Sequence, residues 1–338
     1  MAQVHQLLNA PFSFVSPSSY FITMPSIHSI PIIDFSEFKT NPEKVAQDVF
    51  NACKSIGFFY MVNHDIPAKD IDKAFEVSKS FFDLPREEKT RYKISANNHG
   101  YSELLGQKLD PENQRQGDHK EGFNLRAFEG GKPYAPIPAV FQEHAEFLER
   151  LSKSCHNAAL QILEAFAIAL HIPTEQGGKH FFVGSHNYEG SENVLRFLKY
   201  PRGGESEYKE PVRAGAHSDY GSVTLLFQKD VPGLEVQASR TEWIAAPLIP
   251  GAITVNVGDQ MELWTNGLFK STMHRVTFLP EHNHLDRYSM PYFVQANSDT
   301  SLAPIPSPYV DQTVKDGAIY TAGEHLQKRL AASHGFEK

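Results

Sequence analysis

Three residues in the second half of the chain have the types and spacing of a metal-binding triad. His217 and Asp219 are separated by one residue, and two such side chains on an extended strand point to the same face. The third ligand is His274, in another strand-like run. Two imidazoles and one carboxylate on one side of a metal leave its other positions open, as in non-haem Fe(II) sites that activate oxygen. The same ligands also bind Zn²⁺ in hydrolases, so the triad alone leaves both alternatives open.

A second pair of residues, beyond His274, is suited to bind an anion. Arg287 and Ser289 are again one residue apart, so both side chains face the same way on a strand. A guanidinium fork next to a hydroxyl matches the geometry of a carboxylate. Taken by itself, the pair has an alternative interpretation, in which Arg287 forms a surface salt bridge and binds no ligand.

H-x-D, a distant His and R-x-S together form the signature of the Fe(II)/2-oxoglutarate-dependent dioxygenases. The chain resembles the isopenicillin N synthase-like branch of that family from about residue 30 to residue 330. Further matching stretches are Pro31–Phe35, Gly57–His64, Gly215–Gly221 and Val257–Asp259. The resemblance implies a double-stranded β-helix and an enzyme that uses Fe(II), 2-oxoglutarate and O₂. Such an enzyme hydroxylates, desaturates or cyclises a small organic molecule and releases succinate and CO₂.

The resemblance also assigns roles to individual residues. It assigns His217, Asp219 and His274 to the iron, and Arg287, Ser289 and Tyr200 to the distal carboxylate of 2-oxoglutarate. Relatives often have Asn two residues before the tyrosine, where this chain has Leu198. Some relatives keep the Arg and Ser but use no 2-oxoglutarate, so an oxidase of that kind is one alternative. A non-catalytic small-molecule binder is another, which the intact ligand triad disfavours, and a zinc hydrolase needs no carboxylate clamp.

Residues on strands near the triad are the candidates for substrate contacts. By position these are Asn193, Arg196, Tyr220 and Phe293. A buried Arg favours an anionic or strongly hydrogen-bonding substrate, and a phenyl ring offers a stacking face. The alternative is that Arg196 pairs with an acid such as Glu121 and that Phe293 belongs to the core.

The nearest pattern within the family is that of the fungal thymine 7-hydroxylases. In those enzymes, residues at the positions of the four candidates surround the pyrimidine, and this chain keeps all four residue types. A thymine-like substrate is therefore one prediction. The segment 99–138 looks different from that pattern. Because this segment is predicted to form an irregular lid or binding loop, a different substrate, such as one of secondary metabolism, is favoured.

The elements that must position these residues change in type along the chain. Apolar spacing predicts helices at 41–55, 68–82 and 139–170, and a buried strand at 58–62. After residue 190, short apolar runs between Pro, Gly and Asn turns predict the strands of a sandwich or barrel. The expected fold is mainly β with flanking helices: a double-stranded β-helix, or jelly-roll, core with the helical N-terminal region packed outside it.

Four segments are expected along the chain. Residues 1–24 are predicted to be a disordered extension, with Met24 as a second plausible start. Residues 25–185 form the N-terminal region of helices and strands, and 186–300 form the catalytic core. Residues 301–338 form a C-terminal segment with a closing helix.

Composition narrows the classes of function. The formal charge of −8 argues against a nucleic-acid binder, which needs a basic face. No apolar run is long enough to span a membrane, and the first 38 residues lack the Lys and Arg of a signal or transit peptide. The 2 cysteines fit a reducing compartment. We therefore expect a cytoplasmic enzyme acting on a small molecule, with no nucleic acid, membrane or protein partner implied.

Overall fold

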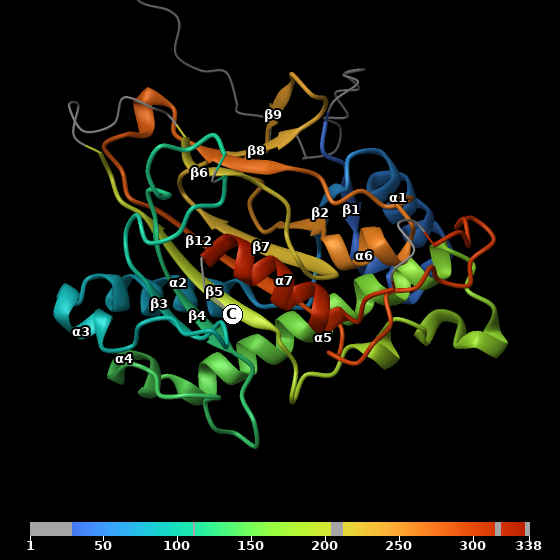
Figure 1. Ribbon diagram of the computed structural model, residues 1–338, viewed down its shortest axis with the longest axis horizontal. Helices are drawn as coiled ribbons and strands as arrows, with labels where there is room; N and C mark the ends of the chain where they lie inside the picture. The colour runs from blue at the N-terminus through green and yellow to red at the C-terminus, as the bar shows by residue number, and fades with distance from the viewer. Residues whose placement is uncertain (1–28, 111, 204–211, 315–318, 335–338) are drawn as a thin grey trace, which may run out of the picture.

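The protein folds around two β-sheets in a jelly-roll arrangement, with most helices on one side (Figure 1). The computed structural model describes residues 29–110, 112–203, 212–314 and 319–334. The predicted N-terminal extension, 1–24, lies outside the described residues. The predicted fold class, a mainly β jelly roll with flanking helices, is confirmed. The division into four segments stays a prediction.

The larger sheet has eight strands and the smaller sheet has four. In spatial order the larger sheet contains β1 (Ile32–Asp34), β2 (Phe58–Val62), β10 (Ile253–Val257), β7 (Val223–Lys229), β12 (Arg287–Val294), β5 (Val194–Tyr200), β4 (Glu121–Arg126) and β3 (Gly100–Ser102). The smaller sheet contains β6 (Val212–His217), β11 (His274–Thr277), β8 (Leu234–Gln237) and β9 (Trp243–Ala245). Neighbouring strands are antiparallel except for β1 and β2, which are parallel.

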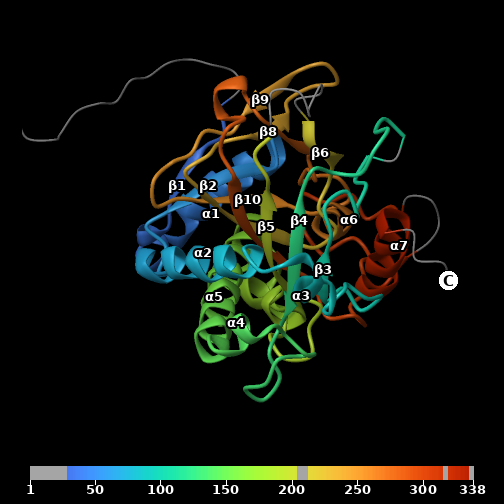
Figure 2. The same cartoon turned by 90° about the vertical axis from the view of Figure 1, so that its left-hand side faces the viewer.

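Seven α-helices in the described residues surround the two sheets. They are α1 (Pro42–Ser55), α2 (Ala68–Phe82), α3 (Arg86–Thr90), α4 (Ala139–Gln142), α5 (Ala145–Ala169), α6 (Asp259–Trp264) and α7 (Ala322–His334). Short 3-10 helices cover Phe35–Lys39, Thr174–Gln176, Gly178–His180, Val183–Ser185 and Pro280–His282. Helices α2 and α5 support the larger sheet from its outer face by packing against β5, β7 and β12, and α5 is seen below the larger sheet in Figures 1 and 2. The main hydrophobic core fills this layer, as the packed rings of Phe123, Phe141 and Phe197 show.

Local sequence explains how the first elements begin and end. The side chain of Asn41 accepts a hydrogen bond from the Lys44 N–H and caps α1, and Pro42 occupies the first turn. Gly57 has a φ of 72° between α1 and β2, and a Cβ there would lie 2.0 Å from the carbonyl oxygen of Lys270. Only glycine fits this turn, and the turn sends β2 back into the sheet.

Two predictions about the middle of the chain are wrong in part. The segment 99–138 contains β3 and β4, which extend the larger sheet beyond β5. Residues 123–126 alternate between apolar and polar side chains, but this alternation is only four residues long. All residues of β4 are buried, including Glu121 and Arg126, whose charge is untypical of a buried strand. The predicted helix 139–170 is divided into α4 and α5, with Glu143 and His144 between them. None of the helices in the described ranges has the length and apolar character needed to cross a membrane.

Candidate active site

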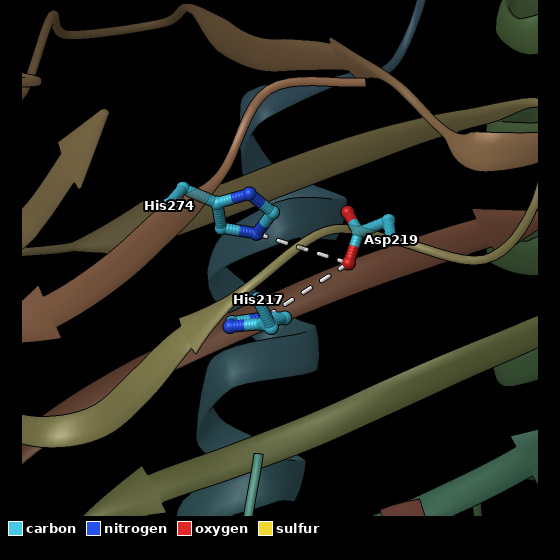
Figure 3. Close-up of side chains that lie close together, drawn as sticks. All are labelled: His217, Asp219 and His274. Carbon is cyan, nitrogen blue, oxygen red and sulfur yellow. Dashed lines mark ion pairs between the residues drawn. The ribbon is translucent and has the colours of Figure 1, made fainter. Parts of the chain in front are cut away.

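The three predicted metal ligands converge at one edge of the smaller sheet. His217 ends β6 and His274 begins β11, and the two residues face each other in this antiparallel pair, with ring centroids 4.3 Å apart. The Asp219 Oδ1 lies 4.0 Å from His217 Nε2 and 3.8 Å from His274 Nε2 (Figure 3). The prediction that His217 and Asp219 share a strand is wrong, because β6 ends at His217. The bend after the strand, rather than strand alternation, carries the carboxylate to the imidazoles.

Backbone carbonyls orient both imidazoles. His217 Nδ1 lies 2.8 Å from the oxygen of Gly215, and His274 Nδ1 lies 3.2 Å from the oxygen of Thr272. When each Nδ1–H donates to its carbonyl, each Nε2 presents a lone pair to a metal. Burial, reinforced by the neighbouring His274, lowers the pKa of His217 to about 3. His217 is therefore neutral at physiological pH, as a metal ligand must be.

Two neighbours on the larger sheet fix the carboxylate of Asp219. Thr224 Oγ1 and Asn256 Nδ2 each donate a hydrogen bond of 2.7 Å to Asp219 Oδ2. Thr224 on β7 and Asn256 on β10 are direct cross-strand partners, so a single register places both donors. Burial acts to raise the pKa of Asp219, but His274, His217 and these hydrogen bonds outweigh it, and the net shift is downward. Oδ1 stays ionised and directed at the imidazoles.

The donor set fits a divalent iron. One ligand atom from each of the three residues lies within 4.8 Å of the others. Two imidazoles and one carboxylate on a single face form the arrangement typical of non-haem Fe(II) sites.

Arg287 and Ser289 lie in the same cavity as the triad. Arg287 is 1% exposed, and it donates to Gln228 Oε1 at 2.9 Å and to Ser289 Oγ at 3.4 Å. Its guanidinium lies 4.9 Å from the ring centroid of Tyr200, its cross-strand partner on β5. Across the described ranges no acidic side chain pairs with Arg287, and its Nε has no partner. A buried guanidinium of this kind is stable when an anion completes its hydrogen bonds.

The cavity lies between the two sheets and encloses about 980 Å³ of empty space, part of it open to solvent. Among the predicted residues, it is lined by His217, Asp219, His274, Arg287, Ser289, Tyr200, Arg196, Tyr220 and Phe293. Asn193 is not among the lining residues, contrary to its predicted role as a substrate contact. The Asn193 carboxamide is committed elsewhere: Oδ1 accepts from the Gln295 N–H at 2.7 Å, and Nδ2 lies 3.4 Å from His156.

Comparisons with known proteins agree with this geometry. A family model described as "non-haem dioxygenase in morphine synthesis N-terminal" matches residues 30–142, and the "2OG-Fe(II) oxygenase superfamily" model matches residues 191–296. A UPF0676 protein of Schizosaccharomyces pombe is 38% identical over 315 residues, which cover 91% of this chain and 93% of that protein. The chain belongs to the 2OG-Fe(II) oxygenase superfamily.

Other similar proteins include two hydroxylases. The homoarginine-6-hydroxylase of Glycine max is 32% identical over 341 residues, covering 89% of this chain and 96% of that protein. The crystal structure of Neurospora crassa thymine 7-hydroxylase with alpha-ketoglutarate (2-oxoglutarate) has a TM-score of 0.78 and 30% identity. That match covers 89% of this chain and 96% of the Neurospora chain. This protein is accordingly a non-haem Fe(II)/2-oxoglutarate-dependent dioxygenase, and the zinc hydrolase and non-catalytic binder are set aside.

The oxygenase cavity has a polar wall that the sequence predicted only in part. Arg196 donates to Gln107 Oε1 at 2.8 Å. The predicted alternative, a pair with Glu121, is wrong, because Glu121 accepts from Lys89 Nζ and from the Tyr101 hydroxyl, each at 2.6 Å. Within the described residues Arg196 therefore reaches the cavity without forming an ion pair, although the charge of Asp118 is close enough to act on it.

Several residues that shape this oxygenase site were missed from sequence. They are Thr224 and Asn256 beside Asp219, Gln228 beside Arg287, Gln107 and Lys120 near Arg196, and Leu326 and Leu330 of α7. Asn256 did carry a signal, since it is a lone amide inside the apolar run of β10. Lys120 and Gln107 carried none, because their segment was read as an irregular loop.

The C-terminal helix of the oxygenase closes one side of the cavity. Arg329 on α7 pairs with Asp259 at 3.0 Å and donates to the Ser218 hydroxyl at 3.2 Å. Its guanidinium also lies 4.6 Å from the ring centroid of Tyr220. Because Ser218 lies between His217 and Asp219, these contacts tie α7, the red helix of Figure 1, to the metal-binding bend.

Proposed function

We propose that this oxygenase oxidises a small organic molecule by hydroxylation, desaturation or ring formation, with release of succinate and CO₂. The observation that carries the proposal is Arg287, a buried guanidinium with no acidic partner in the described part of the chain, in the same cavity as the triad. The distal carboxylate of 2-oxoglutarate would complete its hydrogen bonds. A cytoplasmic location belongs to the proposal too, supported by the free, buried thiols of Cys53 and Cys155.

Each group of residues has a separate task in this proposal. His217, Asp219 and His274 would hold Fe(II), and Arg287, Ser289 and Tyr200 would bind the distal carboxylate of 2-oxoglutarate. Together with O₂, bound iron and 2-oxoglutarate supply the oxidising power. The remaining tasks are orientation and exclusion of water, which the apolar lining residues Phe58, Leu226, Leu234 and Val276 support.

A thymine-type substrate is a second candidate, favoured by one specific likeness. The Neurospora hydroxylase has been crystallised with alpha-ketoglutarate and thymine, and it is 30% identical to this chain. Three of the residues predicted to surround a pyrimidine, Arg196, Tyr220 and Phe293, line the cavity here. The fourth, Asn193, does not. Thymine-dependent release of succinate would distinguish this candidate from other substrates.

The proposed function can be tested without knowing the substrate. Under nitrogen, Fe(II) and then 2-oxoglutarate are added to the apoprotein, and the visible charge-transfer band of the chelate is followed. We expect a band that is lost in His274→Ala and that needs far more 2-oxoglutarate in Arg287→Ala. Arg275→Ala is the matched control, because Arg275 pairs with Glu235 outside the cavity.

The possible outcomes separate the alternatives. Iron binding without a chelate band would place the protein with oxidases that use no 2-oxoglutarate. A band that persists in His274→Ala would overturn the assignment of the triad. Succinate release would then identify substrates, with thymine tested first.

A further inference from the structure

We propose that the substrate of this oxygenase is an organic acid with one negative charge, bound through its carboxylate by Arg196 and Lys120. The inference rests on the proposed function and concerns the same cavity. It concerns a wall of the cavity separate from Arg287, which the proposal reserves for 2-oxoglutarate. Arg196 was a predicted substrate contact, whereas Lys120 had no role in the sequence interpretation.

Two cations meet on this wall of the cavity. Arg196 on β5 is 8% exposed, and Lys120, directly before β4, is 4% exposed. Both side chains line the cavity, and Gln107 and Asn124 lie beside them on the same lining. The positive charge of Arg196 contributes to the lowered pKa of Lys120, after the larger effect of burial. Cations this deeply buried require compensating negative charge.

The negative charge available on this wall is one unit short. Asp118 pairs with Lys120 at 2.5 Å, and it accepts further hydrogen bonds from Gly215 N–H at 3.0 Å and Gln114 Nε2 at 2.8 Å. Arg196 bonds to the neutral amide of Gln107, and it forms no ion pair within the described residues. The nearby charge of Asp219 is committed to the metal. The single carboxylate of Asp118 thus faces the positive charges of both Lys120 and Arg196, and a substrate carboxylate would neutralise the excess charge.

Both cations are charged at neutral pH. Arginine stays protonated in proteins. Burial, partly offset by Asp118, lowers the pKa of Lys120 to about 8, which leaves its amine mostly protonated at neutral pH. The excess positive charge therefore persists under physiological conditions.

Arg196 is also held in place with a free donor. Its Nε is buried and has no hydrogen-bond partner, although its Nη2 is fixed by Gln107. Gly122 on the neighbouring strand makes room for this group, since a Cβ there would lie 3.2 Å from Arg196 Nε and 2.9 Å from Leu198 Cδ2. A buried donor without an acceptor is costly, so a ligand oxygen that accepts a hydrogen bond from Arg196 Nε would stabilise the site.

The rest of the cavity indicates the body of the acid. Phe293 and the α7 residues Leu326 and Leu330 add apolar lining to the cavity. These side chains suit a ring or an alkyl chain. A neutral pyrimidine such as thymine would leave the positive charge of Arg196 and Lys120 uncompensated, so the two substrate classes differ in a measurable way.

The test measures binding rather than turnover. Wild-type protein is loaded with Mn(II) in place of Fe(II) and with saturating 2-oxoglutarate, so that the metal and Arg287 are occupied. Benzoate, cyclohexanecarboxylate and hexanoate are titrated by calorimetry, each beside its neutral amide and beside thymine. At least one carboxylate should bind about tenfold or more tightly than its amide, as expected for a charge-assisted hydrogen bond.

Variants assign the preference to the two cations. Arg196→Met and Lys120→Met should each weaken carboxylate binding about tenfold or more and leave binding of the amide unchanged. Lys199→Met is the matched control, because Lys199 is on the same strand but pairs with Asp286 outside the cavity. The chelate band with Fe(II) and 2-oxoglutarate is recorded for every variant, and it should be normal in all three.

Failure of the inference and of the proposed function can be told apart. A normal chelate band with no preference for any carboxylate, or with tighter binding of thymine, overturns the inference and leaves the proposed function standing. A carboxylate preference that survives in both Arg196→Met and Lys120→Met also overturns it. Absence of the band in wild-type protein overturns the proposed function and, with it, the inference.

Discussion

His274 lies directly opposite His217 across the antiparallel strands β11 and β6. This register brings together two ligands that are far apart in sequence, with their ring centroids 4.3 Å apart. Side chains alternate along a strand, so a slip of one residue would turn His274 to the other face of the sheet. The metal site therefore depends on strand pairing as much as on the identity of the ligands.

The hydroxyl of Thr224 should be needed for tight metal binding. It donates to Asp219 Oδ2 at 2.7 Å and fixes the carboxylate. Thr224→Val keeps the shape but loses this donor, and we expect it to weaken Mn(II) binding by about tenfold to a hundredfold, as outer-shell changes do. Thr224→Ser retains the hydroxyl and should bind Mn(II) almost as the wild type does. Equal affinities in the Val and Ser variants would show that the hydrogen bond has no such role.

Gln228 should be needed for tight binding of 2-oxoglutarate but not for binding of the metal. Its Oε1 accepts from Arg287 at 2.9 Å and holds the guanidinium in the cavity. In Gln228→Leu, the concentration of 2-oxoglutarate that gives half of the chelate band should rise about tenfold, while Mn(II) affinity is unchanged. Gln237→Leu, on β8 and outside the cavity lining, is the control. A loss of metal affinity in Gln228→Leu would contradict this division of tasks.

Short motifs predicted the centre of the site well. The motifs are H-x-D, the distant His and R-x-S, and each depends on the types and spacing of a few residues. All five of their side chains line the cavity. Apolar runs likewise predicted β2 and, after residue 190, a series of short strands, because buried strands need β-branched and aromatic residues. What these patterns predict is local structure and the chemistry of single side chains.

The polar wall could not be predicted, because it depends on contacts between distant segments. Lys120 lies in a run of polar residues that resembles a loop, and its burial depends on Asp118 and on β4 joining the edge of the sheet. Asn193 shows the opposite error. Its position suggested a substrate contact, but its carboxamide oxygen accepts a hydrogen bond from the backbone N–H of Gln295, which follows β12. No local pattern distinguishes these two outcomes.

Gly122 should be required for the position of Arg196. A methyl group at this site would lie 3.2 Å from Arg196 Nε and 2.9 Å from Leu198 Cδ2, so one side chain must move. Gly122→Ala should weaken binding of the carboxylate probes several-fold and lower the free energy of unfolding by roughly 1–3 kcal/mol. The chelate band should persist. Gly184→Ala is the control, because a Cβ there meets nothing within 4 Å; similar probe affinities in the two variants would refute the steric argument.

Buried His186 should make the protein less stable in mild acid. Burial lowers the pKa of His186 to about 4, and its ring lies between the Phe182 carbonyl and the Ser222 hydroxyl. As the pH falls below about 6.5, His186 becomes protonated in the unfolded chain, whereas in the folded chain it stays neutral down to about pH 4. The free energy of unfolding therefore decreases across this pH window. His119 and His156, with pKa values also lowered to about 4 by burial, act in the same direction.

Chemical unfolding between about pH 5 and 7 measures this effect. In His186→Gln the slope of unfolding free energy against pH should decrease by up to about 1.4 kcal/mol per unit. The variant should also be less stable at neutral pH, since it loses a buried ring, but the slope reports the titration alone. Exposed His284 provides the control, and His284→Gln should keep the wild-type slope. A steeper slope in His186→Gln would reverse the assigned sign.

Arg329 should determine how firmly α7 covers the cavity. It is the residue of α7 that contacts Asp259, Ser218 and Tyr220 together, whereas Leu326 and Leu330 supply the apolar lining. Because the Arg329 side chain is partly exposed, its ion pair contributes little to global stability. Arg329→Ala should therefore leave the unfolding midpoint nearly unchanged but loosen the helix.

Hydrogen exchange resolves this local effect. Amides of residues 322–334 should exchange several-fold faster in Arg329→Ala, while those of β5, β7 and β12 keep their protection. Binding of the carboxylate probes should weaken, because Leu326 and Leu330 leave the cavity more often. Lys328→Ala is the matched control, since Lys328 is exposed and lies near Tyr320 rather than the metal-binding bend. If exchange in α7 is equally slow in both variants, the contacts of Arg329 do not hold the helix, and packing of its leucines alone must close the cavity.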